Sequence, residues 1–330
     1  MTAPVLEIHL SDSDAADALH RDVRIGLSAD PKWLPPKWFY DARGSELFEQ
    51  ITMLPEYYPT RTERELLRRS AEEIADRIVV QGAVVDTLVE LGSGSSEKTR
   101  LLLDALIANG SLRRFVPLDV SESALRGAMV AVAREYPGLA VHGVVGDFTQ
   151  HLELLPAGQG GRRLVAFLGG TIGNLLPAER AGFVTALRAV LDPGELLLLG
   201  AGLVTDPAVM VPAYDDGAGV TAEFNRNVLR VLNRELGADF EVDVFDHVAV
   251  WDATHEWIEM RLRARRAMTV RLPRVGMTVH YAEGEEMRTE VSGKFRREGL
   301  GAELADAGFA DHAWWTDPDD RFALVLAAAA

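Results

Sequence analysis

The chain has 330 residues, of which 48% are hydrophobic and 25% are charged, and its formal net charge at pH 7 is −16. This acidic balance argues against nucleic acid or a membrane as a partner, because both reward basic patches. The absence of cysteine excludes disulfides, thiolate metal sites and cysteine nucleophiles. No secretion signal is recognisable, so we expect a cytoplasmic protein.

The first two thirds of the chain predict a parallel sheet. An amphipathic helix near residues 13–27 precedes a stretch rich in proline and aromatic residues. From there to about residue 202, apolar strands alternate with helices, which is typical of a doubly wound sheet with right-handed crossovers. We expect strands at 87–92, 115–120, 140–147, 163–169 and 195–201. The helices are expected near 62–77, 97–109, 121–136 and 177–191.

The pattern changes after residue 203. A helix near 218–236 is followed by short strand-like runs over 240–292, which predict an antiparallel layer. The strings HAWWTDP and RFALVLA then predict a hairpin that completes the edge of the first sheet. The predicted domains are therefore discontinuous. Residues 61–204 with 294–330 form one of them, and residues 1–60 with 205–293 form the other.

The string VELGSGSSEKTR, residues 89–100, predicts a nucleotide-type site. A strand runs into Gly92 and Gly94, and a helix with Glu97 in its first turn is expected to follow. A dinucleotide fingerprint would place glycine at position 97, where a pyrophosphate meets the helix. A carboxylate there would repel phosphates, so the turn favours S-adenosylmethionine (SAM) over NAD.

Two acidic residues at later strand ends each allow two interpretations. Asp119 comes 25 residues after Gly94, where a carboxylate binds ribose hydroxyls, but it is also placed to cap the next helix. Asp147 precedes Phe148, and the pair suits an adenine amino group and ring. The alternative is a turn aspartate followed by a core phenylalanine.

Three candidate substrate-binding residues likewise allow either a binding role or a structural role. Asn174 in FLGGTIGNL is placed to hold an amine or carboxylate, or to cap the helix at Pro177. Tyr57 and Tyr58 in EYYPTRTE are either buried anchors or an aromatic wall for a methylated ammonium. The eight histidines are scattered, so we expect no metal site.

Together these motifs resemble one family, the SAM-dependent L-histidine Nα-methyltransferases of ergothioneine biosynthesis. The resemblance covers about residues 22–317. The matching strings are PPKWFYD, ITMLPEYYPTRTE, VELGSGSSEKTR, GDF, FLGGTIGN, AYDDGAGVTAEFNRNVL, IEM and EEMRTEVSGKF. Two local departures are GAGLV, which lacks an expected acidic residue at the end of the fifth strand, and Gly293, where a larger small residue is usual.

The resemblance implies a class I, Rossmann-like α/β methyltransferase sheet with an α+β substrate-binding domain. The residues expected to contact SAM are Gly92, Lys98, Asp119, Asp147 and Phe148. The residues expected to contact histidine are Tyr57, Asn174, Tyr214, Glu290, Val291 and Ser292, with Tyr40 and Met260 lining the pocket.

The implied reaction transfers three methyl groups from SAM to the α-amino group of L-histidine, giving hercynine, in a monomeric enzyme. Asn174 and Tyr57 are expected to position the substrate, and no general base is assigned. Three alternatives stay open at this point. They are an N-methyltransferase of another aromatic amino acid, an NAD-dependent oxidoreductase, and a SAM-binding module without catalysis.

Overall fold

A computed structural model describes residues 4–80, 84–158 and 160–330, and the described chain divides into two compact units. The first unit contains the described residues up to Leu10, Pro59–Val204 and Phe295–Ala330. The second unit contains Ser11–Tyr58 and Thr205–Lys294. The division is discontinuous, but residues 4–10 belong with the first unit and Lys294 belongs with the second.

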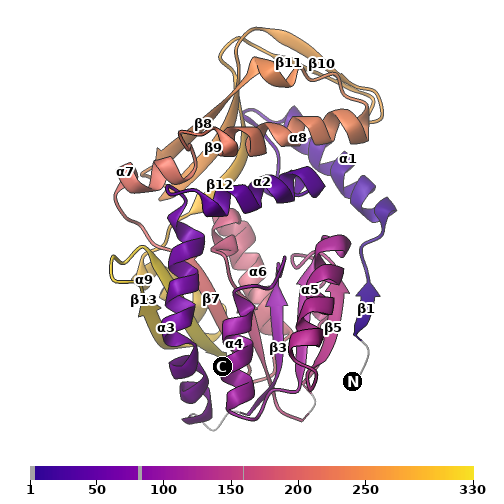
Figure 1. Cartoon of the computed structure of the whole chain (residues 1–330). Helices are drawn as coiled ribbons and strands as arrows, with labels where there is room; N and C mark the ends of the chain where they lie inside the picture. Colours follow the sequence, from indigo (N-terminus) through magenta and orange to yellow (C-terminus); the bar gives the residue numbers. More distant parts are fainter. Residues whose placement is uncertain (1–3, 81–83, 159) are drawn as a thin grey trace. The chain divides into compact units, whose positions relative to one another are not determined.

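The first unit is built on an eight-stranded sheet of order β1-β5-β4-β3-β6-β7-β14-β13 (Figure 1). The parallel strands are β1 (Val5–Ile8), β5 (Ala140–Val145), β4 (Arg114–Asp119), β3 (Val85–Leu91), β6 (Arg162–Phe167) and β7 (Leu196–Gly202). The antiparallel pair β14 (Phe322–Ala329) and β13 (Phe309–Thr316) completes one edge, which confirms the predicted C-terminal hairpin.

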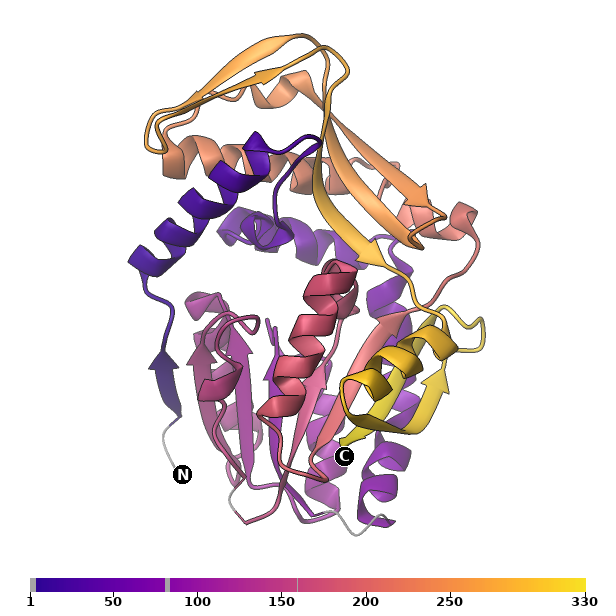
Figure 2. The same cartoon turned by 180° about the vertical axis from the view of Figure 1, so that it is seen from behind.

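Helices cover both faces of this sheet, as a doubly wound α/β fold requires. One face carries α3 (Tyr58–Val80), α4 (Thr99–Ala108) and α5 (Glu122–Glu135) (Figure 1). The other carries α6 (Pro177–Ala189) and α9 (Arg297–Asp306) (Figure 2). Every residue of β3 is buried, which is typical of a strand with helices on both sides.

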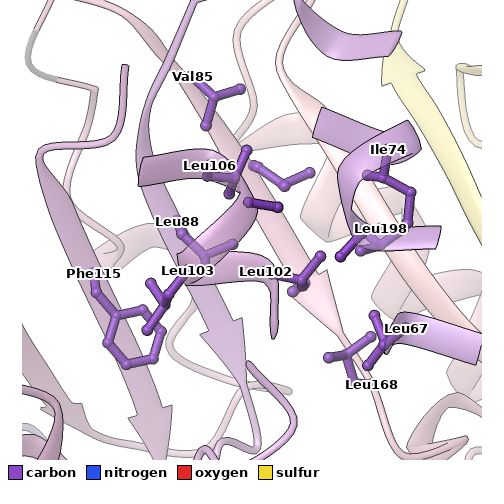
Figure 3. Packing of buried hydrophobic residues seen from close by; sticks show 14 of the residues in the cluster. Leu67, Ile74, Val85, Leu88, Leu102, Leu103, Leu106, Phe115, Leu168 and Leu198 are labelled. Atoms are coloured by element: carbon purple, nitrogen blue, oxygen red, sulfur yellow. The ribbon is translucent and has the colours of Figure 1, made fainter. Parts of the chain in front are cut away.

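The core beneath α3 and α4 shows why their apolar positions predict helices. Leu67 and Ile74 of α3 lie seven residues apart, so they share one helix face. They pack with Leu102 of α4 and with Leu198 of the sheet, and all four side chains are buried (Figure 3). Burying a leucine or isoleucine side chain contributes roughly 1.5–3 kcal/mol.

The edge strand β1 is the part of this sheet that the sequence does not predict. It pairs in parallel with β5 from Val5↔His142 to Ile8↔Val145. The strand has four residues, and Val5 and Ile8 are both exposed, so it gives no period-two pattern of burial. This pairing places residues 5–8 in the first unit, whereas the sequence assigned them to the substrate domain.

The second unit combines a four-stranded sheet with three long helices and several short ones. The sheet order is β2 (Lys32–Trp33), β12 (Glu286–Gly293), β9 (Trp257–Ala264) and β8 (Phe245–Asp252), and a hairpin joins β10 (Met268–Leu272) to β11 (Met277–Tyr281). The long helices are α1 (Asp12–Ser28), α2 (Ala42–Met53) and α8 (Val220–Leu236), which share a buried apolar cluster with the sheet. Ser11 caps α1 in a capping box with Asp14.

Short helical segments connect these elements. They are α7 (Pro207–Met210) and the 3-10 helices η1 (Pro36–Phe39), η2 (Leu152–Leu154), η3 (Thr171–Asn174), η4 (Val211–Ala213) and η5 (Val242–Val244). Among the described residues, no helix is both long and apolar enough to cross a membrane.

Candidate active site

The glycine turn after β3 is held by the next strand of the sheet. Gly92 and Gly94 have φ values of +66° and +49°, a conformation that favours glycine. The backbone N–H of Gly94 donates to Asp119 Oδ2 at 2.8 Å. The expectation that Glu97 lies in the first turn of the helix is wrong, because α4 begins only at Thr99. Glu97 therefore lies before the helix, and its exposed carboxylate pairs with Arg64 at 3.1 Å.

Asp119 does not cap α5. The cap is Ser121, whose side chain accepts from the N–H of Ala124, while Asp119 Oδ1 accepts from the N–H of Ser121 at 2.8 Å. The two carboxylate oxygens thus join the start of α5 to the glycine turn. Each oxygen has further acceptor capacity, so the carboxylate can also receive ligand hydroxyls.

For Asp147 and Phe148 the structure shows the turn and the core packing, and the contact with adenine stays a prediction. Asp147 Oδ1 accepts from the N–H and the hydroxyl of Thr149 at 2.8 and 2.6 Å, so it does close a turn. The ring of Phe148 packs edge-on against Phe167 at a centroid distance of 5.0 Å. It also lies 3.8 Å from where a Cβ of Gly92 would stand. The structure therefore brings the half-exposed Phe148 ring beside the glycine turn.

Lys98 is paired with a carboxylate that the sequence analysis did not single out. Its ammonium binds the carboxylate of Glu63, a completely buried residue of α3. Glu63 Oε1 also accepts from the N–H of Gly169 at 2.6 Å. A Cβ at Gly200 would lie 2.2 Å from the same oxygen, so this position has no room for a side chain. Only the position of Glu63 at the end of the string LPEYYPTRTE pointed to it.

Asn174 is not a helix cap. It ends η3 and is half-buried, whereas the N-cap of α6 is Leu176. Gly169 and Gly170 before it have φ values of +83° and +69°, so this loop depends on glycine in the same way as the first turn does. The capping interpretation of Asn174 is wrong, and a role in binding stays a prediction.

The tyrosines expected to contact the substrate lie together in the second unit. The rings of Tyr57 and Tyr214 meet edge-on at a centroid distance of 6.1 Å. Tyr40 packs edge-on against Phe224 at 5.6 Å. Burial raises the pKa of Tyr57 well above its usual value, and the neighbouring Tyr214, Tyr40 and Glu290 raise it further. The phenol of Tyr57 therefore stays neutral near pH 7.

The strand β12 directs alternate residues to opposite faces. Glu290 and Ser292 share one face. Met260 on the neighbouring strand β9 is the pairing partner of Glu290. Val291 points to the other face, so its side chain is not on the side where Glu290 and Ser292 lie. Burial raises the pKa of Glu290 to about 8, and the positive charge of Lys294 opposes this rise. The hydroxyls of Tyr214 and Ser292 are hydrogen-bonded at 2.7 Å.

Comparisons with known proteins identify the family. A family model described as "Histidine-specific methyltransferase, SAM-dependent" matches residues 19–329. The chain belongs to this family. It is 59% identical to a histidine N-alpha-methyltransferase of Mycolicibacterium smegmatis, over 97% of each chain. It is 57% identical to one of Mycobacterium tuberculosis, over 97% of this chain and 98% of the relative.

A third relative of this methyltransferase is larger. The ergothioneine biosynthesis protein 1 of Neurospora crassa is 33% identical over 70% of this chain, which corresponds to 27% of that protein. Membership in a SAM-dependent family confirms the predicted cofactor class and rejects the NAD-dependent alternative.

Glu90 gives an independent test of whether the first unit suits SAM. This residue is the second-last of β3, just before the glycine turn, and it is buried. One oxygen accepts from the hydroxyl of Thr99, while Oε2 has no hydrogen-bond partner among the residues that the structure describes. Burial raises the pKa of Glu90 to about 7, and Thr99 and Lys98 oppose the rise. A buried carboxyl with an open oxygen suits a cationic ligand such as SAM and not a pyrophosphate.

Replacing Asp119 by alanine is expected to weaken binding of S-adenosylhomocysteine at least about tenfold. The change removes two expected hydrogen bonds to ribose, each worth ~1.5–3 kcal/mol, and frees the N–H of Gly94. Isothermal titration calorimetry measures the affinity. As a control, Asp104→Ala removes an exposed carboxylate that accepts from the hydroxyl of Tyr136 at 2.8 Å. Unchanged affinity in Asp119→Ala would show that the ribose assignment is wrong.

Proposed function

We propose that this methyltransferase transfers three methyl groups from SAM to the α-amino group of L-histidine, giving hercynine for ergothioneine biosynthesis. The observation that carries the proposal is the 57–59% identity to histidine N-alpha-methyltransferases over nearly the whole chain. The second unit adds a polar set that suits an imidazole, namely Glu290, Ser292 and Tyr214. A cytoplasmic location and a monomeric state are further parts of this proposal, and sedimentation equilibrium tests the latter.

The residues of the chain are assigned separate tasks in this reaction. SAM supplies an electrophilic methyl group on a positively charged sulfur. Gly92, Asp119 and Phe148 hold its adenosine, while Glu290 and Ser292 hold the imidazole of histidine. Asn174 and Tyr57 position the amino acid end of the substrate. Alignment of the two reactants can account for several kcal/mol of the barrier.

A panel of substrates tests the proposal. The protein is incubated with SAM and each of the twenty amino acids, and the products are analysed by mass spectrometry. Histidine alone is expected to gain one, two and three methyl groups. Methylation of another aromatic amino acid in preference to histidine would show that the protein is an N-methyltransferase of that amino acid instead. Binding of SAM with no product from any amino acid would favour the non-catalytic module.

The rate with histidine is expected to rise with pH until the substrate amine is neutral. The amine must lose its proton before it attacks, and the two central tyrosines are poor bases. Burial raises the pKa of Tyr57 and of Tyr214, and Glu290 raises both further. Steady-state kinetics between pH 6 and 10 measure the profile. An optimum below about 6.5, the ordinary pKa of a histidine side chain, would instead require a dedicated base.

A further inference from the structure

A buried lysine completes the polar set of the second unit. Lys294 follows β12, and its backbone N–H donates to the carbonyl of Glu256 at 2.8 Å. Its ammonium donates to Tyr214 Oη at 2.8 Å and to Ser292 Oγ at 2.9 Å. The two hydroxyls are themselves 2.7 Å apart, so the three polar atoms form a closed triangle. All three side chains are buried.

Burying the charge of this lysine costs free energy, and its surroundings offset that cost only in part. Burial lowers the pKa of Lys294, while the neighbouring Tyr58 and Glu290 favour its charged form. The ammonium also lies 4.9 Å from the ring centroid of Tyr214, within the range of a cation–π contact. Buried lysines are rare unless they are paired, so this residue requires an explanation beyond packing.

The hydrogen atoms in the triangle can be counted. An ammonium only donates, so Lys294 occupies an acceptor site on each hydroxyl oxygen. The two hydroxyls carry one hydrogen each, and the hydrogen bond between Tyr214 and Ser292 uses one of these two hydrogens. One O–H therefore remains to donate to another group, and so does the third hydrogen of the ammonium. Glu290 lies on the same face of β12 as Ser292, and its carboxylate only accepts.

We propose that Lys294 is a positioning residue that gives the imidazole site its polarity. It fixes the hydroxyls of Tyr214 and Ser292 so that one O–H donates to the unprotonated ring nitrogen of histidine. Its charge favours the carboxylate form of Glu290, which accepts from the ring N–H. This inference rests on the proposed function.

The resulting pattern matches a neutral imidazole and few other rings. Imidazole offers one N–H donor and one nitrogen acceptor, which match the carboxylate acceptor of Glu290 and the remaining hydroxyl donor. An indole has only the N–H donor, so it would leave the hydroxyl hydrogen unpaired in a buried site. A phenol has no ring nitrogen, and its one polar atom lies at the far end of the ring. Lys294 would therefore contribute to substrate choice without touching the substrate.

Three variants and one matched control test this role. Lys294→Met keeps most of the stem and removes the charge and both hydrogen bonds. Lys294→Gln keeps hydrogen-bonding capacity without charge. It replaces Lys294→Met in the test if the methionine variant does not fold. Ser292→Ala removes one hydroxyl and leaves the charge. Lys32→Met is the control, because Lys32 pairs with the carboxylate of Glu285 and lies over the ring of Tyr281, away from the triangle.

Lys294→Met is expected to raise the KM for histidine about tenfold or more, with a smaller change in kcat. The ratio of its KM to that of the unmodified protein should fall as pH rises. The reason is that loss of the lysine charge raises the pKa of Glu290 further above about 8, so the carboxylate is recovered only in alkali. The other titratable groups facing this pair are Tyr57, Tyr58 and Tyr214, and burial raises the pKa of Tyr57 and Tyr214.

The controls separate charge from packing. Ser292→Ala should raise KM by a factor that does not vary with pH, and Lys32→Met should leave KM unchanged. Affinity for S-adenosylhomocysteine reports folding in every variant. A KM for Lys294→Met that is unchanged, or raised equally at every pH, would overturn the proposal and leave the enzyme activity standing. An unmodified protein that does not methylate histidine would overturn the proposed function itself.

Discussion

Replacing Glu290 by alanine is expected to lower kcat/KM for histidine by about 10- to 150-fold. The carboxylate accepts from the imidazole N–H, and a charge-assisted hydrogen bond of this kind is worth ~1.5–3 kcal/mol. Affinity for S-adenosylhomocysteine should hardly change, because Glu290 belongs to the second unit while the expected adenosine contacts belong to the first. Steady-state kinetics with histidine and calorimetry with S-adenosylhomocysteine measure the two effects.

The same variant should accept tryptophan better than the unmodified protein does. Alanine removes the charge and part of the bulk beside Met260, so a larger apolar ring meets less opposition. Glu290→Gln is the matched control, since it keeps the volume and one acceptor but cannot become charged. Its loss with histidine should be smaller, and it should gain little with tryptophan. Full selectivity for histidine in Glu290→Ala would show that another residue selects the substrate.

The advantage of the unmodified protein over Glu290→Ala should grow with pH. Burial raises the pKa of Glu290 to about 8, with Lys294 opposing the rise, so the carboxylate form increases between pH 7 and 9. The amine and imidazole of the substrate titrate identically with both proteins, and their contribution cancels in the ratio of the two kcat/KM values. A ratio that falls over this range would indicate that the protonated carboxyl binds histidine.

The parts of the fold that the sequence predicts are those encoded by local patterns. The Gly92–Gly94 turn follows a fully buried strand, and each βαβ crossover has its own helix period and strand length. The C-terminal hairpin is equally local, because two apolar runs flank the turn at Asp317. The edge strand β1 is different. Its four residues pair with β5 across more than a hundred positions, and its exposed side chains carry no signal of pairing.

The candidate site shows the same division between local and distant information. A resemblance located Tyr57, Tyr214 and Glu290, but it gave no partner for Lys98 or Lys294. Lys98 pairs with Glu63, 35 positions away, and Lys294 meets Tyr214, 80 positions away. Lone lysines usually indicate a solvated surface, so only the folded chain shows that these two are bound to buried groups. The capping alternatives for Asp119 and Asn174 needed the helix ends, which sequence patterns place least precisely.

Replacing Glu195 by alanine is expected to destabilise the first unit by ~3–5 kcal/mol, a large part of the 5–15 kcal/mol that holds a typical domain folded. Glu195 and Arg163 are both buried, and the carboxylate receives the guanidinium at 2.5–2.9 Å. It also accepts from the backbone N–H of Arg163 at 3.0 Å and of Asp192 at 2.8 Å. Alanine would leave the arginine charge unpaired inside the protein. Thermal unfolding should show a Tm lower by roughly 6–20 °C.

The stability difference between the unmodified protein and Glu195→Ala should become smaller in acid. The exposed pair of Glu122 and Arg126 provides a comparison. Burial alone would raise the pKa of Glu195, but hydrogen bonds from Arg163 and Asp192 outweigh it and hold the pKa below its usual value. The stabilisation is therefore complete above the unfolded pKa of about 4.3 and is lost as pH falls through the lower folded value. Glu122→Ala breaks an exposed pair with Arg126 and should cost less than ~1 kcal/mol at any pH. If the two variants unfold at similar temperatures at pH 7, the Arg163–Glu195 pair contributes no more to stability than a surface ion pair.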